Sequence, residues 1–365
     1  MLRAPVARAR GHSGTQILGI PAGTGGGEGT LACWNGPCHG TQQLRRSRKV
    51  GQNLTLPSRS DRTTGQSAAP SGRHVVASRA VTVEDPARVL ARVDGYLHLV
   101  PLSGARAHEI DRFTLFRSTT AWSYYARPRP PGVSGPTTDF TATDIERLWA
   151  RCRELRVPLS LEWVHQLAPS LAGAAGAAGL VVVEHPLLVL RPADFRPAPG
   201  PSGVSVEIVA ADRTALVTAR AVADVAFGVP GTQVGEAGAG ERDDKASTVG
   251  AARGNALLER TRNGVTVTAV AHRDDGRPIA SGQHQPVGTC TEVVAVATLP
   301  AFRRRGLAAA VTSLLVTDAF ERGIDLVMLS AQNGYVARIY ERLGFARIGS
   351  VGAAEPPDLP HHSPI

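Results

Sequence analysis

The sequence predicts an α/β fold in which helices pack on a mixed β-sheet. First, residues 204–352 alternate between apolar runs of strand length and runs with helical spacing, which is typical of sheets covered by helices. Second, residues 79–198 show strands and helices in an α+β order. Third, the stretch "RPAPGPSG" breaks all periodicity between them, so residues 199–203 are expected to link two domains.

Both ends of the chain lack these patterns. Residues 1–78 contain "GTGGGEGT" and "SRSDRTTGQSAAPSGR" and few apolar side chains. Such a segment buries too little apolar surface to offset the entropy lost on ordering, so a disordered tail is expected. Residues 353–365 are expected to form a second disordered tail. No run of 18 or more apolar residues offers a membrane span.

The net charge of +9 is concentrated in the first tail. Residues 1–80 hold 11 Lys and Arg against two acidic residues, whereas the remaining chain holds 29 of each sign. The part expected to fold is therefore neutral, which argues against a basic nucleic-acid-binding face on it.

Cysteine usage argues against disulfides and against a metal site. Four cysteines in 365 residues are too few for a disulfide framework, and a reducing cytoplasm fits best. Cys33 and Cys38 with His39 give half of a zinc site, but no second pair follows at ligand spacing. We predict no bound metal.

The first domain is expected to contain two longer helices and several strands. In the second helix, Thr143 and Glu146 have the spacing of a capping box. Gly179 is expected to end a third, alanine-rich helix, and Pro186 to separate two paired strands. The predicted segments are helices over 85–100, 143–157 and 168–179, and strands over 159–164 and 180–190.

The second domain is expected to alternate strands and helices throughout. The glycine-rich stretch 228–244 predicts a long loop, and Asp275 with Gly276 predicts a hairpin turn within 264–285. The remaining predicted strands cover 204–210, 290–300, 324–330 and 345–351, and the predicted helices cover 212–227, 304–323 and 333–344.

Three arginines and a glycine stand where the strand over 290–300 gives way to a helix. A helix start has N–H groups without partners and carries partial positive charge, so it attracts anions. Gly306 lets an anion approach the backbone closely, and Arg303, Arg304 and Arg305 add positive charge. The combination predicts a phosphate or diphosphate site. Arginine-rich helix starts also occur as solvated surface.

Two separated motifs resemble those of the GNAT superfamily of acyl-CoA-dependent N-acetyltransferases. One is V-x-P followed by [R/Q]-x-x-G-x-[G/A], represented here by Thr298 to Pro300 and by Arg303 to Ala308. The other is N-x-x-A-x-x-x-Y-x-x-x-G-F, represented by Asn333, Val336, Tyr340, Gly344 and Phe345. Thr298 replaces the usual Val and Val336 the usual Ala. The resemblance covers residues 204–352 and implies a GNAT fold there.

The resemblance implies a site for acetyl-CoA, used as a cosubstrate. The diphosphate is expected on the N–H groups of Arg304 through Ala309, and the pantetheine arm along the strand edge at Val296 to Thr298. Asn333 would hold the cofactor or cap its helix. The expected cofactor-binding residues are Val296, Ala297, Thr298, Arg303, Arg304, Arg305, Gly306, Leu307, Ala308, Ala309, Asn333 and Tyr340.

The first domain resembles a degenerate GNAT copy without a cofactor site. Gly179 and Leu180 stand where Gly344 and Phe345 stand in the second domain, but no equivalent of Tyr340 is present. The arrangement is similar to two-domain acetyltransferases common in actinobacteria. A bacterial origin also fits the use of arginine in place of lysine. The first domain is expected to wall the substrate cleft.

Acetyl transfer to an amine implies a base, an oxyanion donor and an acid. Glu292, on the strand that leads to the acetyl group, is the first candidate for the base, and His284 on the preceding strand is the alternative. Both residue types are also common as solvated or hydrogen-bonded surface groups. The main-chain N–H of Val296 would meet the oxyanion. Tyr340 would protonate the leaving thiolate, unless it only packs in the core.

The resulting prediction is a cytoplasmic acetyl-CoA-dependent N-acetyltransferase acting on a primary amine of a small molecule or peptide. The alternative is a regulatory module that binds acyl-CoA without turnover. Glu236, Glu241, Asp243 and Asp244 on the predicted loop could attract a cationic acceptor, but they are too sparse to name one.

Overall fold

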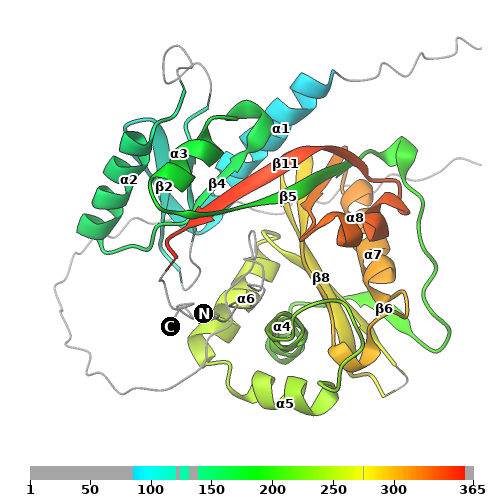
Figure 1. Cartoon of the computed structure of the whole chain (residues 1–365). Coiled ribbons are helices and arrows are strands. Elements are labelled where there is room, and N and C mark those ends of the chain that lie inside the picture. Colours follow the sequence, from blue (N-terminus) through cyan, green and yellow to red (C-terminus); the bar gives the residue numbers. More distant parts are fainter. Residues whose placement is uncertain (1–84, 121–123, 131–138, 274, 358–365) are drawn as a thin grey trace, which may run out of the picture. The chain divides into compact units, whose positions relative to one another are not determined.

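The computed structural model in Figure 1 describes residues 85–120, 124–130, 139–273 and 275–357. These residues belong to one compact unit built on an eleven-stranded sheet with both parallel and antiparallel neighbours. The predicted α/β fold with a mixed sheet is therefore confirmed. The disordered tail predicted for 1–78 and the residues of the half zinc site lie outside the described residues.

The first half of the described chain ends at the irregular stretch that includes residues 199–203. Its helix α2 has a capping box two residues earlier than predicted. Thr141 and Asp144 bond reciprocally, rather than Thr143 and Glu146, because Thr141 is the last extended residue before the helix. The elements are α1 (Pro86–Leu99), η1 (Val100–Ser103), β1 (Ala105–Ile110), β2 (Phe113–Ser118), β3 (Ala126–Pro128), α2 (Ala142–Leu155), β4 (Leu161–Val164), η2 (His165–Leu167), α3 (Leu171–Ala177), β5 (Val181–Leu190) and η3 (Pro192–Asp194).

The second half contains a helix where a loop was predicted. The loop after α4 ends at Gly238, because its N–H donates to the Glu241 carboxylate at 2.7 Å and starts helix α5. The predicted hairpin with a turn at Asp275 and Gly276 is confirmed. The elements are β6 (Ser205–Ile208), α4 (Arg213–Gly228), α5 (Ala239–Ser247), α6 (Ala251–Arg262), β7 (Val267–His272), β8 (Pro278–Val287), β9 (Cys290–Thr298), η4 (Pro300–Phe302), α7 (Leu307–Glu321), β10 (Leu326–Ser330), α8 (Gly334–Glu341) and β11 (Ala346–Glu355).

Strand β5 is a single ten-residue strand and does not turn at Pro186. It pairs with β10 on one side and with β11 on the other. Pro186 has no N–H to donate, but the strand tolerates this. Its neighbour on that side is Ala331, just past the end of β10, where the hydrogen bonds between β5 and β10 stop. The expectation of two paired strands around Pro186 was wrong.

The last strands of the two halves are exchanged in the sheet. The strand order is β1-β2-β3-β4-β11-β5-β10-β9-β8-β7-β6, so β11 lies between β4 and β5, and β5 lies between β11 and β10 (Figure 1). Ala353 and Ala354 pair with Glu162 and Leu161, so the strand continues to Glu355 and the predicted tail cannot begin at 353. The predicted division at residues 199–203 stays a prediction.

Side-chain alternation assigns the helices to the two faces of the sheet. Leu188 and Leu190 of β5 pack in the core that contains α7 and α8, whereas Leu187 and Val189 pack against α1. On β7, Ala269 and Ala271 pack in the α7 core, whereas Val270 packs with α4. Helices α1 and α4 therefore cover the face opposite α7 and α8. Among the described residues, no helix is long and apolar enough to cross a membrane.

Candidate active site

A cleft opens where β9 and β10 separate. The two strands pair in parallel only where Cys290–Glu292 lie opposite Leu326–Met328. Farther along β9, a bulge takes Ala295 and Val296 out of register with β8, and Ala295 has a positive φ of 53°. The cleft has a volume of about 560 Å³ and is lined by residues of β5, β9, α7, α8 and the loop after α4. A cleft of this size can hold a small organic ligand.

The start of α7 presents N–H groups without helical partners to this cleft. Gly306 is the N-cap residue, with a left-handed φ of 80°, and no side chain of the described residues caps the helix. The first helical bond runs from the Ala310 N–H to the Gly306 carbonyl at 3.1 Å. The N–H groups of Leu307, Ala308 and Ala309 therefore have no acceptor in the preceding turn, and all three residues line the cleft.

The Arg303 guanidinium holds the loop after α4 in place. It donates to the carbonyl oxygens of Ala226 and Val229 at 2.8 and 3.0 Å, at the end of α4. Burial lowers the pKa of Arg303. Although Arg303 lines the cleft, its donors are directed to the backbone of the protein, so its clearest role is to shape the wall.

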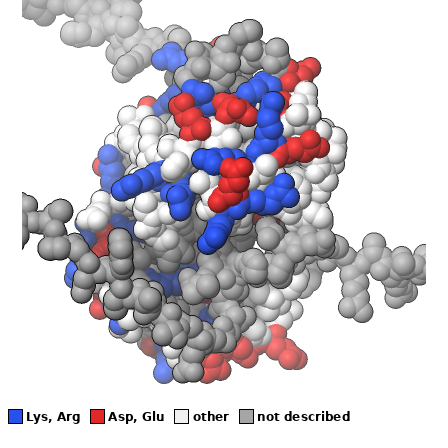
Figure 2. All heavy atoms as spheres, turned by 90° about the vertical axis from the view of Figure 1, so that its left-hand side faces the viewer, with Lys and Arg blue, Asp and Glu red and all other residues white. Residues whose placement is uncertain are grey.

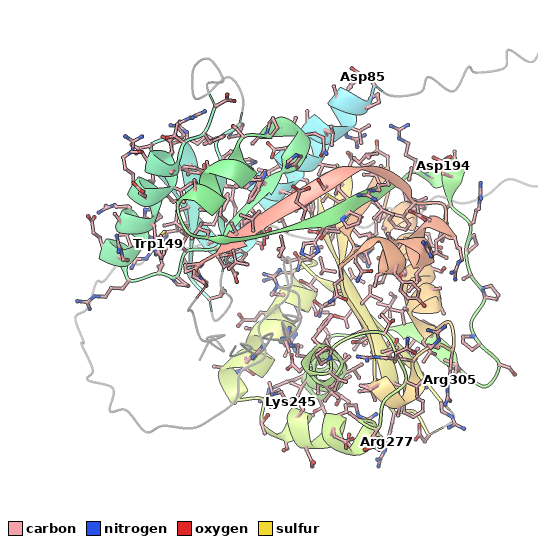
Figure 3. All side chains as sticks on the ribbon, viewed as in Figure 1. Asp85, Trp149, Asp194, Lys245, Arg277 and Arg305 are labelled. Carbon is pink, nitrogen blue, oxygen red and sulfur yellow. The ribbon has the colours of Figure 1, made fainter. Side chains whose placement is uncertain are left out.

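The other two arginines point in different directions. Arg304 is exposed, lines the cleft and donates to the Tyr335 hydroxyl at 3.2 Å. Arg305 does not line the cleft, and Figure 3 shows it on the outer side of the molecule. Its guanidinium lies 5.4 Å from the centre of the Phe302 ring. The structure therefore brings Arg304, but not the Arg305 side chain, to the site.

Glu292 is a buried carboxyl group in the wall of the cleft. Only 1% of its surface is exposed, and its Oε2 atom has no hydrogen-bond partner among the described residues. Burial raises the pKa of Glu292 well above its usual value; the negative charge of Glu162 adds to this rise, and the positive charge of Arg127 opposes it. A carboxylate of raised pKa in a cleft suits proton transfer near neutral pH.

A tyrosine of the first half fixes the backbone at Glu292. The N–H of Glu292 donates to the hydroxyl oxygen of Tyr96 at 3.1 Å. The same hydroxyl donates to the Gln285 carbonyl at 2.8 Å. Helix α1 therefore bridges β8 and β9 just before the cleft opens.

Tyr340 lines the cleft from α8. Its ring packs edge-on against Phe345, with 6.0 Å between ring centres. Burial raises the pKa of Tyr340 to about 12, so its hydroxyl keeps its proton at neutral pH. At the start of the same helix, the Asn333 Oδ1 accepts from the N–H groups of Tyr335 and Val336, both at 3.0 Å. Asn333 caps the helix and does not itself line the cleft.

His284 does not lie in the cleft. It is fully buried, with Nδ1 3.0 Å from the Thr291 hydroxyl and Nε2 2.9 Å from the Asp318 carboxylate of α7. Burial lowers the pKa of His284, although Asp318 opposes this effect. Of the two candidate bases, the structure brings only Glu292 to the cleft.

The strand and helices that form much of the cleft, β9, α7 and α8, lie in a segment that matches a known protein family. Residues 241–345 match the model of the acetyltransferase (GNAT) family. This matched part of the chain, which has the GNAT fold, is called the GNAT domain below. It contains the helix start at Gly306, the carboxyl of Glu292 and the hydroxyl of Tyr340.

Solved structures resemble a larger part of the chain. A GCN5-related N-acetyltransferase from Kribbella flavida is 22% identical over 74% of this chain and 96% of its own, with a TM-score of 0.55. A GCN5-related N-acetyltransferase from Sphaerobacter thermophilus is 16% identical over 67% of this chain and 80% of its own, with a TM-score of 0.44. No match was found among curated proteins. The first similarity shows a shared fold beyond the GNAT domain itself.

The sequence patterns missed several residues that line this cleft. These residues reach the cleft because elements distant in the sequence pack together. The only signals in the sequence were the length of the predicted loop 228–244 and the helical spacing of α8. They are His185 of β5, Phe227 of α4, Val229 to Thr232 of the next loop, Gln332, and Tyr335, Arg338, Ile339 and Arg342 in and after α8.

Charges of both signs cover the outer face of the first half. Figure 2 views the side that α2 occupies in Figure 1 and shows Lys and Arg interspersed with Asp and Glu. On α2, Arg151 pairs with Glu154 at 2.6 Å. The part of this face that the structure describes therefore offers no broad area of positive charge alone for nucleic-acid phosphates. In the described ranges, no group of three His, Cys, Asp or Glu side chains could hold a metal ion.

Proposed function

We propose that the chain is an acetyl-CoA-dependent N-acetyltransferase whose acceptor is a primary amine of a small molecule or peptide. The observation that carries this proposal is a single cleft with free helix N–H groups at Leu307 to Ala309 and a buried carboxyl at Glu292. An anion site and a proton acceptor in one cleft suit a phosphate-bearing acyl donor and an amine acceptor.

The anion site fits the diphosphate of coenzyme A. The N–H groups of Leu307, Ala308 and Ala309 would donate to its oxygens, and the helix dipole favours its charge. Arg304 is exposed beside them, and Arg338 and Arg342 of the α8 segment also line the cleft. These guanidinium groups supply further donors for phosphate.

The strand edge fits the extended arm of the donor. Val296, Ala297 and Thr298 line the cleft after the bulge at Ala295. Beyond the bulge β9 no longer pairs with β10, so its main-chain groups on that side remain available for an added extended segment. The Val296 N–H is our candidate donor to the developing oxyanion.

The proton transfers can be assigned to two groups in the cleft. The Glu292 carboxylate would accept a proton from the acceptor's ammonium group, which leaves a neutral nitrogen to attack the thioester carbonyl. Acetyl-CoA supplies the activated acetyl group, whose C–S bond breaks as the C–N bond forms. The Tyr340 hydroxyl would donate its proton to the leaving sulfur. The second proton, which the attacking nitrogen loses as the C–N bond forms, would pass through solvent and restore the Tyr340 hydroxyl. Burial raises the pKa of Tyr340, so the phenol carries the proton that this step requires.

The first experiment is calorimetric titration of the full chain with acetyl-CoA, followed by an amine screen that detects thiol release. We expect binding, and acetylation of at least one primary amine. Absence of binding by a folded sample would contradict the cofactor assignment. Binding without acetylation of any amine would favour the alternative, an acyl-CoA-binding regulatory module.

A further inference from the structure

A histidine from the first half of the chain lies in the wall of the cleft. His185 belongs to β5, the strand that inserts between β10 and β11. It lines the cleft together with Glu292 and Tyr340, although it lies outside the GNAT domain. The residue is 5% exposed. The strand exchange therefore brings a titratable group of one half into the site of the other.

The hydrogen bond at Nδ1 of His185 determines which ring nitrogen carries the proton. The Nδ1 atom of His185 lies 3.0 Å from the carbonyl oxygen of Gln332. A carbonyl oxygen can only accept, so in the neutral ring Nδ1 carries the proton and Nε2 has a lone pair. The Nε2 atom is buried and has no partner among the described residues. A buried acceptor without a partner is costly unless a ligand or water supplies a donor.

His185 and Glu292 point to the same face of the sheet. Side chains at alternate positions share a face. His185 alternates with Leu187 and Val189, which pack against α1, and Glu292 alternates with Cys290, which also packs against α1. This face is opposite α7, whose start is the anion site. His185 therefore lies on the side of the sheet from which an acceptor would approach Glu292.

We propose that His185 is a substrate-binding residue, whose Nε2 accepts a hydrogen bond from an N–H or O–H group of the acyl acceptor. This inference rests on the proposed function. The first half, which lacks a cofactor motif, would then contribute directly to acceptor recognition. A merely structural His185 would need only its bond to Gln332.

Two substitutions separate these roles. His185→Asn can keep a donor near the Nδ1 position, and so the bond to Gln332, but it removes Nε2. His185→Gln can place an amide oxygen near the Nε2 position, but it loses the bond to Gln332. Each variant is compared with the wild type in acetyl-CoA titration, in thermal unfolding and in transfer to the best amine of the screen.

We expect His185→Asn to lower kcat/KM for the amine about tenfold, as the loss of one ordinary hydrogen bond does. Its affinity for acetyl-CoA and its unfolding temperature should stay at the wild-type values. His185→Gln should regain part of the lost kcat/KM. In ¹⁵N-histidine spectra, the Nε2 of His185, assigned by its absence in His185→Asn, should be unprotonated.

Three results would overturn the inference. An unchanged kcat/KM for the amine in His185→Asn would remove the proposed contact while leaving the transferase function intact. A selective loss of acetyl-CoA affinity would place His185 in the donor site instead. A proton on Nε2 would exclude it as an acceptor even without turnover. If the wild type acetylates no amine, the proposed function itself has failed.

Discussion

At the helix start, the substitution Gly306→Ala tests the proposed diphosphate site. Its effect on ligand binding can be measured apart from its effect on backbone strain. Gly306 has a φ of 80°, and a Cβ atom added there would meet only the Pro201 side chain, at 3.9 Å. That distance is ordinary van der Waals contact, so Gly306→Ala suffers no clash. Its cost is the left-handed backbone, which is about 1–2 kcal/mol for a residue with a Cβ.

A glycine outside the cleft provides the matched control. Gly264 has a φ of 68°, and an added Cβ there would meet nothing within 4 Å. Gly264→Ala should therefore lose the same free energy of unfolding as Gly306→Ala, about 1–2 kcal/mol. Denaturant unfolding of both variants measures this cost and shows that each still folds.

The two variants should differ in acetyl-CoA binding. The Cβ of Gly306→Ala would stand where the diphosphate approaches the N–H groups of α7, and each charge-assisted hydrogen bond there is worth about 1.5–3 kcal/mol. Loss of one such bond weakens binding about tenfold to a hundredfold. Calorimetric titration should show this loss for Gly306→Ala alone. Equal affinities in the two variants would refute the diphosphate site.

Three further substitutions test the cleft and its surroundings. Tyr340→Phe should lower kcat by about 10²–10⁴-fold, as loss of a general acid does, while acetyl-CoA still binds in calorimetry; an unchanged kcat would remove the hydroxyl from the mechanism. Glu292→Gln should abolish most turnover yet raise the unfolding temperature at pH 7. Burial raises the folded-state pKa of Glu292, so its ionisation opposes folding above the unfolded pKa of about 4.3, and the gain should vanish below that pH. A gain that persists in acid would contradict this reasoning. His284→Ala should cost about 3 kcal/mol in denaturant unfolding, because it leaves a cavity and removes one hydrogen-bond partner each from the buried Thr291 hydroxyl and from Asp318, which keeps Arg322, but the folded fraction should keep its kcat. A selective loss of kcat would return His284 to the list of candidate bases.

Local patterns in the sequence predicted most helices and strands of the second half. The change from strand spacing to helical spacing at Gly306 depends on residues adjacent in the sequence. The left-handed turn at Gly344, where φ is 98°, also follows from adjacent residues. An added Cβ at Gly344 would lie 1.9 Å from the Asp194 carbonyl, so the glycine of the second motif is required by the connection between the halves. That contact is not visible in the sequence, although the glycine is.

Strand pairing and side-chain direction were harder to predict because they depend on distant segments. The exchange of β5 and β11 leaves no local pattern, so neither the continuous strand through Pro186 nor the place of His185 could be foreseen. On β8, a shift of one residue in register turns a side chain from one face to the other. The sequence therefore placed His284 on a plausible strand, but it could not show that the ring faces Asp318.

The position of β11 has a consequence for synthesis of the chain. In the sheet that the structure describes, β11 alone pairs with both β4 and β5, and it begins 156 residues after the end of β5 at Leu190. At about 5–20 residues per second, a ribosome needs roughly 8–30 s to make that stretch. Until then the strand position between β4 and β5 in the nascent first half is empty. Its exposed backbone edges can be satisfied only by water, a chaperone or a wrong strand.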